Sequence, residues 1–198
     1  MTTGQPSREE AEQAVATLLR WIGDDPDRAG LRRTPQRVVD AYLEHFRGYG
    51  TSPEAILGTS FDEIDGTKGI VLLRDIAFES HCEHHLAPMI GRAHLAYRPG
   101  NRVVGIGCLA RLVDCFAKRL QVQERLTTQI AEAIRDILLP KGVAVLVEAT
   151  HHCMTTRGVH RPGATMVTSR YLGCFETEPA DRQEFLALIA GPGGIAGR

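Results

Sequence analysis

The sequence has no long apolar run, no block of one charge and no disulfide framework. Its formal net charge at pH 7 is −1 over 198 residues, and its basic residues, nearly all arginine, are scattered. No basic run is interleaved with aromatic residues, which argues against nucleic acid or an acidic membrane surface as a partner. No segment is long and apolar enough to span a bilayer, so we expect no membrane span.

The first ten residues and the cysteines predict the compartment. Residues 1–10 are polar and lack the apolar core of a signal peptide. The five cysteines are an odd number without the spacing of a disulfide scaffold. This usage favours a reducing compartment and thiols that are buried or metal-bound. We therefore expect a cytoplasmic protein.

Two helices are predicted near the start of the chain. The segment Ser7–Glu10 has the form of a capping box, and apolar residues follow it at helical spacing as far as Ile22. Thr34 and Pro35 predict the N-cap and first residue of a second helix, which runs to Phe46.

The rest of the chain is predicted to run as two strands, two helices and two strands. Strand periodicity is seen in Ile70–Phe78, Ile90–Tyr97, Val143–Cys153 and Ala164–Phe175, and helical periodicity in Leu109–Phe116 and Val122–Ile137. This order predicts an α+β fold in which an antiparallel sheet carries helices packed on one face. We expect a helical extension over residues 1–58, a main domain over 59–190 and a glycine-rich, flexible tail over 191–198.

The strongest chemical signal is the segment Glu79–Pro88, which contains one thiol and three imidazoles. Cys82 and His85 are spaced i, i+3, so one tight turn can bring a sulfur and a ring nitrogen to the same ion. That pairing suits zinc. A catalytic zinc keeps three protein ligands and one open position, so a further ligand is needed elsewhere.

The segment Thr150–Cys153 offers the third ligand. If strand alternation continues to its end, His151 and Cys153 project from one face and His152 from the other. Cys153 is then the third ligand, and His151 lies beside the metal as an acid or base. His84, displaced around the turn of the first segment, is a second acid or base. A structural zinc site and merely buried histidines are the alternatives that spacing alone leaves open.

Several separate blocks carry a resemblance to a known family. They are Ser80–His85, Gln121–Thr127 and His151–Gly158, together with Gly30-Leu31 and Thr34–Val38 near the start. In content and order these blocks resemble the signature blocks of GTP cyclohydrolase I, and the resemblance runs from about Asp25 to Phe175. It is specific, because unrelated blocks must coincide.

The resemblance implies a fold, an assembly and a reaction. Residues 59–190 would form a T-fold catalytic domain, in which sheets of several subunits close into a barrel, and the subunits would form a homodecamer with active sites between them. The reaction would open the guanine imidazole ring of GTP at C8, release formate and rearrange the product to 7,8-dihydroneopterin triphosphate, feeding folate or another pterin. Zn²⁺ on the Cys/His/Cys set would activate water, and His84 and His151 would transfer protons.

The resemblance also assigns the substrate contacts. Glu124 matches a glutamate that accepts from N1 and the 2-amino group of guanine, and Gln123 lies beside it. Arg111 and Arg157 match positions that contact the triphosphate, and Arg37 matches one that reaches the triphosphate in a neighbouring subunit's site. Without the resemblance, Glu124 would be a solvated residue at a helix start, Arg111 and Arg157 would be partners in surface salt bridges, and Arg37 would be a solvated residue on an exposed helix face.

One block departs from the family pattern. Where the family usually has Gly-Leu-Ser-Lys, this chain has Gly105–Cys108, so Gly107 and Cys108 replace the serine and the lysine. The change removes a hydroxyl and a positive charge from the polyphosphate end of the site, where one charge-assisted contact is worth about 1.5–3 kcal/mol. We expect Cys108 to be a small buried hydrophobe, as we do Cys115 and Cys174.

Three functions therefore stay open. The first is a GTP cyclohydrolase I, and the second is a divergent paralogue that acts on another guanine nucleotide or stops at a ring-opened intermediate. The third is a non-catalytic, zinc-stabilised assembly that binds a nucleotide or regulates a partner. His84 and His151 argue against the third, because a structural site needs no spare imidazoles. A zinc nucleoside deaminase is excluded, since its Pro-Cys-x-x-Cys loop is missing, and a T-fold nitrile reductase has no such Cys/His/Cys set.

Overall fold

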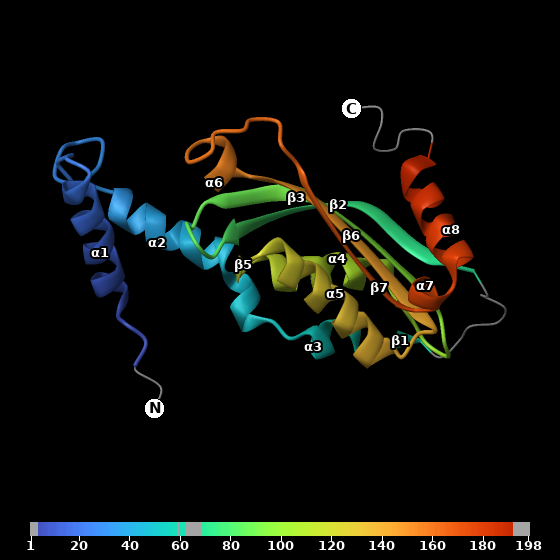
Figure 1. Cartoon of the computed structure of the whole chain (residues 1–198). Coiled ribbons are helices and arrows are strands. Elements are labelled where there is room, and N and C mark those ends of the chain that lie inside the picture. Colours follow the sequence, from blue (N-terminus) through green and yellow to red (C-terminus); the bar gives the residue numbers. More distant parts are fainter. Residues whose placement is uncertain (1–3, 59, 62–68, 192–198) are drawn as a thin grey trace. The chain divides into compact units, whose positions relative to one another are not determined.

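The computed structural model describes residues 4–58, 60–61 and 69–191 (Figure 1). The chain divides into two compact units, Met1–Arg47 and Gly48–Arg198. Of the predicted flexible tail, only Gly191 lies within the described residues. None of the described helices has the length and apolar character needed to cross a bilayer.

The first unit contains the two predicted helices, α1 (Arg8–Trp21) and α2 (Thr34–His45). The capping box of α1 is confirmed, because the Glu10 N–H donates to Ser7 Oγ at 3.1 Å and the Ser7 N–H donates to a Glu10 carboxylate oxygen at 2.7 Å. Two of the backbone donors at this helix start are thereby satisfied.

The start of α2 corrects the prediction for Thr34. Thr34 is the first helical residue rather than the N-cap, which is Arg33, and no side chain caps this helix. The Thr34 N–H donates to Leu31 O at 2.8 Å, so the chain is already turning before the helix begins. Pro35 stands in the first turn, where its missing N–H leaves no helical hydrogen bond unmade.

The second unit has an α+β fold. After a 3₁₀ turn (Arg47–Gly50), its elements are α3 (Pro53–Leu57), β1 (Ser60–Phe61), β2 (Val71–Cys82), β3 (Pro88–Arg98), β4 (Val103–Val104), α4 (Ile106–Ala117), β5 (Leu120–Gln121), α5 (Gln123–Leu138), β6 (Gly142–His151), α6 (His152–Thr155), β7 (Met166–Gly173), α7 (Cys174–Thr177) and α8 (Pro179–Ala190). The unit begins at Gly48 and not at residue 59, because α3 packs on α4 and α5 and its Leu57 is fully buried.

The main sheet has the strand order β5-β2-β3-β6-β7. β2, β3, β6 and β7 are antiparallel neighbours, as predicted, and the short β5 adds a parallel edge beside β2. A bulge interrupts β2, where Arg74 and Asp75 stand opposite the single residue His94. Asp75 adopts a positive φ of 59° there, a conformation that Asp tolerates better than most residues.

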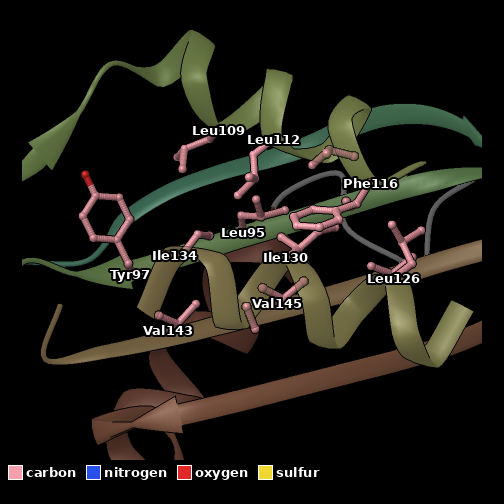
Figure 2. Close-up of a cluster of buried hydrophobic side chains, with 14 of the residues drawn as sticks. Leu95, Tyr97, Leu109, Leu112, Phe116, Leu126, Ile130, Ile134, Val143 and Val145 are labelled. Carbon is pink, nitrogen blue, oxygen red and sulfur yellow. The ribbon is translucent and has the colours of Figure 1, made fainter. Parts of the chain in front are cut away.

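The main core lies between this sheet and the helices α4 and α5 (Figures 1 and 2). Alternate residues of the strands face it, as period-2 patterning requires, and Leu95, Tyr97 and Val145 are fully buried. Leu112 of α4 and Ile130 of α5 meet them from the helical side. Each such side chain contributes about 1.5–3 kcal/mol on burial.

A second core lies on the opposite face of the sheet, which corrects the prediction that helices cover only one face. Phe175 and Phe185, from α7 and α8, are fully buried and pack with Ala96 and Ala144. The small side chains of Ala96 and Ala144 leave room for the rings. A bond of 2.8 Å between the Arg98 guanidinium and the Asp181 carboxylate helps to hold α8 in place.

Candidate metal centre and substrate site

The first half of the metal centre is the turn between β2 and β3. The Cys82 N–H donates to Ala87 O at 2.8 Å, and the Leu86 N–H donates back to Cys82 O at 2.9 Å. Leu86 has a positive φ of 54°, which lets the chain reverse direction within so short a turn. β2 and β3 therefore form a hairpin with this turn at its tip.

An ion pair ties this turn to the start of α5. Glu83 of the turn binds the guanidinium of Arg125, and the Glu83 N–H donates to Gln121 O at 3.0 Å. Sequence reasoning did not identify this contact. The sequence holds one indication of it: Glu83 and Arg125 lie in two of the blocks that carry the family resemblance, Ser80–His85 and Gln121–Thr127.

The second half of the centre reaches the turn through strand pairing. β3 and β6 pair in a register that sets Met89 opposite His151, so the end of β6 lies beside the start of β3. The strand ends at His151, however, and Cys153 lies in the one-turn helix α6. The prediction that strand alternation continues to Cys153 is therefore wrong, because the backbone turns into α6 at His152.

Three ligand atoms meet at this point. Among the described residues, Cys82, His85 and Cys153 form a group whose ligand atoms all lie within 4.8 Å of one another. Cys82 Sγ is 3.7 Å from His85 Nδ1. Tetrahedral zinc, with Zn–S of about 2.3 Å and Zn–N of about 2.0–2.1 Å, would set these two atoms about 3.6 Å apart. The donor set and its spacing therefore fit a zinc ion.

His84 lies beside this group without belonging to it. Its Nδ1 is 3.8 Å from Cys82 Sγ, almost as near as that of His85. The three-residue group nevertheless excludes His84, and its side chain is 64 % exposed. His84 is thus free to face a ligand.

Burial and neighbouring groups shift two pKa values here. Burial raises the pKa of the Cys153 thiol, and so does the nearby Cys82 thiol, whereas the positive charge of Arg157 acts in the opposite direction. Burial lowers the pKa of His151, and the negative charge of Glu124 opposes that change. These influences indicate that Arg157 is near Cys153 and Glu124 is near His151.

The start of α5 contributes two neighbouring side chains with opposite surroundings. Glu124 is exposed in the first turn, and among the described residues its carboxylate has no hydrogen bond or ion pair within the protein. Gln123 is 1 % exposed, and its Oε1 lies 2.8 Å from His151 Nε2. Only Glu124 of the two is therefore open to a ligand.

The remaining predicted substrate residues are less closely tied to the centre. Arg111 is exposed on α4, and its guanidinium donates to Cys108 Sγ at 3.0 Å. Arg37 is exposed on α2, in the first unit. Cys108 and Cys115 are buried, as expected, whereas Cys174 is only half-buried.

Fold and site together define a class of protein. The chain is an α+β protein with a Cys/His/Cys group suited to a metal ion and two further imidazoles beside it. The family model described as GTP cyclohydrolase I matches residues 11–190. The chain therefore belongs to the GTP cyclohydrolase I family.

Curated relatives agree with this assignment. The chain is 50% identical over 190 residues to "GTP cyclohydrolase 1" of Sinorhizobium fredii, a match that covers 96% of this chain and 93% of the relative. It is 52% identical over 187 residues to the protein of the same name from Allorhizobium ampelinum, covering 94% and 93% of the two chains. A third, from Brucella suis, is 53% identical over 186 residues and covers 93% and 87%.

Proposed function

We propose that this protein is a zinc-dependent GTP cyclohydrolase I. It opens the guanine imidazole ring of GTP at C8, releases formate and yields 7,8-dihydroneopterin triphosphate after rearrangement. The observation that carries the proposal is the meeting of Cys82, His85 and Cys153, with His84 and His151 beside them, in a chain that matches the family over nearly its whole length.

Two histidines carry the proton transfers. A zinc ion held by the Cys/His/Cys group would supply Lewis-acid activation of water. His151 is half-buried at the end of β6, and burial lowers its pKa, which favours the neutral ring that can take up a proton and return it. His84 is more exposed and serves the second transfer at the rim of the site.

Glu124 and three arginines bind the substrate. The unpartnered Glu124 carboxylate can accept from both donors on the far edge of guanine, N1–H and the 2-amino group. Arg111 and Arg157 contact the triphosphate, because planar guanidinium groups suit phosphate oxygens. Arg37, from the first unit, completes the triphosphate contacts in a neighbouring subunit's site.

The assembly we propose is a decamer in which T-fold domains close into barrels. The first unit is an N-terminal extension to this domain. In the described part of the chain, β7 forms one edge of the sheet and pairs only with β6, and such an edge needs a partner or a cover. Because two of the three metal ligands are thiols, a reducing compartment such as the cytoplasm suits the site.

A divergent paralogue is the second candidate, and Gly107 and Cys108 favour it. Gly107 is exposed at the start of α4, and an added side chain there would meet no atom within 4 Å. Cys108 is 6 % exposed and bonded to Arg111. Arg111 is therefore a group beside this position that can supply the positive charge the family's lysine would bring.

The deciding experiment is an anaerobic incubation of the zinc-loaded protein with GTP, GDP and GMP in parallel, with formate release and pterin fluorescence followed separately. Both signals from GTP are expected. Formate without fluorescence, or a preference for GDP or GMP, would instead support the divergent paralogue. Neither signal from any nucleotide would support the non-catalytic assembly.

A further inference from the structure

The Gln123 side chain is enclosed by groups of the protein itself. It is 1 % exposed, at the first turn of α5. Its Nε2 lies 3.0 Å from Val147 O of β6, 3.0 Å from Met166 O of β7 and 3.2 Å from Thr168 Oγ1. The amide therefore ties the start of α5 to two strands of the sheet.

These neighbours determine which way the Gln123 amide points. Carbonyl oxygens can only accept hydrogen bonds, so the amide nitrogen must face Val147 O and Met166 O. The flipped amide would set Oε1 against both carbonyl oxygens, acceptor against acceptor. It would lose both hydrogen bonds from Nε2 to these oxygens, at a cost of about 0.5–1.5 kcal/mol each.

The fixed amide in turn determines the tautomer of His151. Gln123 Oε1 is 2.8 Å from His151 Nε2, and an amide oxygen has no hydrogen to donate. His151 Nε2 must therefore carry the hydrogen and donate it. In the neutral imidazole, Nδ1 then has no hydrogen and keeps its lone pair.

A hydroxyl relay supports this arrangement. Thr127 Oγ1 donates to Gln123 O at 2.8 Å and lies 2.6 Å from Thr168 Oγ1. The two hydrogens of Gln123 Nε2 have three acceptors within reach, so Thr168 Oγ1 at 3.2 Å shares a hydrogen with one of the two carbonyl oxygens. Thr168 can in turn donate to Thr127. The residue that holds His151 is thus itself held by its own backbone and by two strands.

We propose that Gln123 is a positioning residue that holds His151 as the Nε2–H tautomer, and so leaves the bare Nδ1, with its lone pair, as the ring atom that is open to substrate. The second half rests on the proposed function. Gln123 consequently acts through His151 and not by direct contact with guanine.

The first test needs no variant of Gln123. In zinc-loaded protein labelled with ¹⁵N-histidine, two-bond nitrogen–proton correlations distinguish a protonated ring nitrogen from a bare one. The His151 signal is assigned by its loss in His151→Asn. At alkaline pH, where the ring is neutral, we expect Nε2 protonated and Nδ1 bare. The opposite pattern would overturn the inference.

The second test separates positioning from substrate contact. In Gln123→Met, which keeps the volume and removes the acceptor, we expect kcat for formate release from GTP to fall about 10- to 100-fold. KM should change by less than about twofold, because no substrate contact is lost. A raised KM with unchanged kcat would show that Gln123 binds substrate, and would refute the positioning role.

A control for the loss of a buried hydrogen bond is available in Tyr97→Phe. Tyr97 is fully buried near the end of β3 that lies away from the metal-binding turn, and its hydroxyl accepts from the Val104 N–H at 3.2 Å, with no histidine involved. We expect this variant to lose stability but to keep kcat. An equal loss of kcat in both variants would overturn the inference. If wild-type protein releases no formate from any nucleotide, the proposed function fails, whereas the tautomer measurement still decides the role of Gln123.

Discussion

Replacing Glu124 by Gln tests how the site recognises guanine. The carboxylate is exposed in the first turn of α5, and among the described residues it has no bond within the protein. Glu124→Gln therefore breaks no described contact. It removes a favourable charge at a helix start, worth about 0.3–1 kcal/mol, and a charge that raises the pKa of His151. The variant should fold, and because an effect through His151 would act on every nucleotide alike, a comparison between nucleotides isolates the contact with the base.

The magnitude follows from the hydrogen bonds that guanine offers. A carboxylate can accept from N1–H and the 2-amino group at once, whereas an amide offers one acceptor and turns a donor toward the other. The loss of one charge-assisted bond costs about 1.5–3 kcal/mol. That corresponds to a fall in kcat/KM for GTP of about 10- to 150-fold.

The assay compares GTP with ITP, whose base lacks the 2-amino group. Formate release is measured for both nucleotides with wild-type protein and with Glu124→Gln. We expect wild-type protein to prefer GTP, and the variant to lose more activity on GTP than on ITP. If the ratio of the two kcat/KM values is the same in both proteins, Glu124 does not contact the 2-amino group and the reasoning fails.

Three further predictions concern the metal, the pH dependence of stability and the second core. Cys82→Ala should abolish zinc binding in metal analysis while the control Cys115→Ala retains it; unchanged zinc in Cys82→Ala would refute the site. Burial lowers the pKa of His94 below its ordinary 6.5, so below about pH 6.5 the unfolded chain binds a proton that the folded chain does not, and stability falls as the pH drops. Urea unfolding should show a weaker acid dependence for His94→Asn, and an identical dependence would contradict this. Phe185→Ala should cost about 3–5 kcal/mol in the same assay, because the ring is fully buried; a cost below about 1 kcal/mol would show that α8 does not pack on the sheet.

The local elements were predictable from the sequence by itself, because each depends on residues a few positions apart. The capping box at Ser7, the helical spacing of α4 and α5 and the alternation in β3 all appear where the pattern indicated. The Cys82 and His85 pair is local in the same sense. The family resemblance added the identity of the reaction, which composition and spacing did not contain.

The helix α8 was missed for a physical reason. Its packing depends on Phe185 meeting Phe175 and two alanines of distant strands. Pro179 at its first turn is a helix-start signal, but it does not say which face of the sheet the helix will cover.

Only the tertiary structure decided how the site is assembled. Cys153 reaches Cys82 because β3 and β6 pair in one register and the chain then turns into α6, and no local pattern specifies either event. Gln123 was predicted as a substrate contact from its position beside Glu124. Its burial between α5, β6 and β7 instead directs its amide to His151, since a buried polar group must bond to whatever the fold brings within reach.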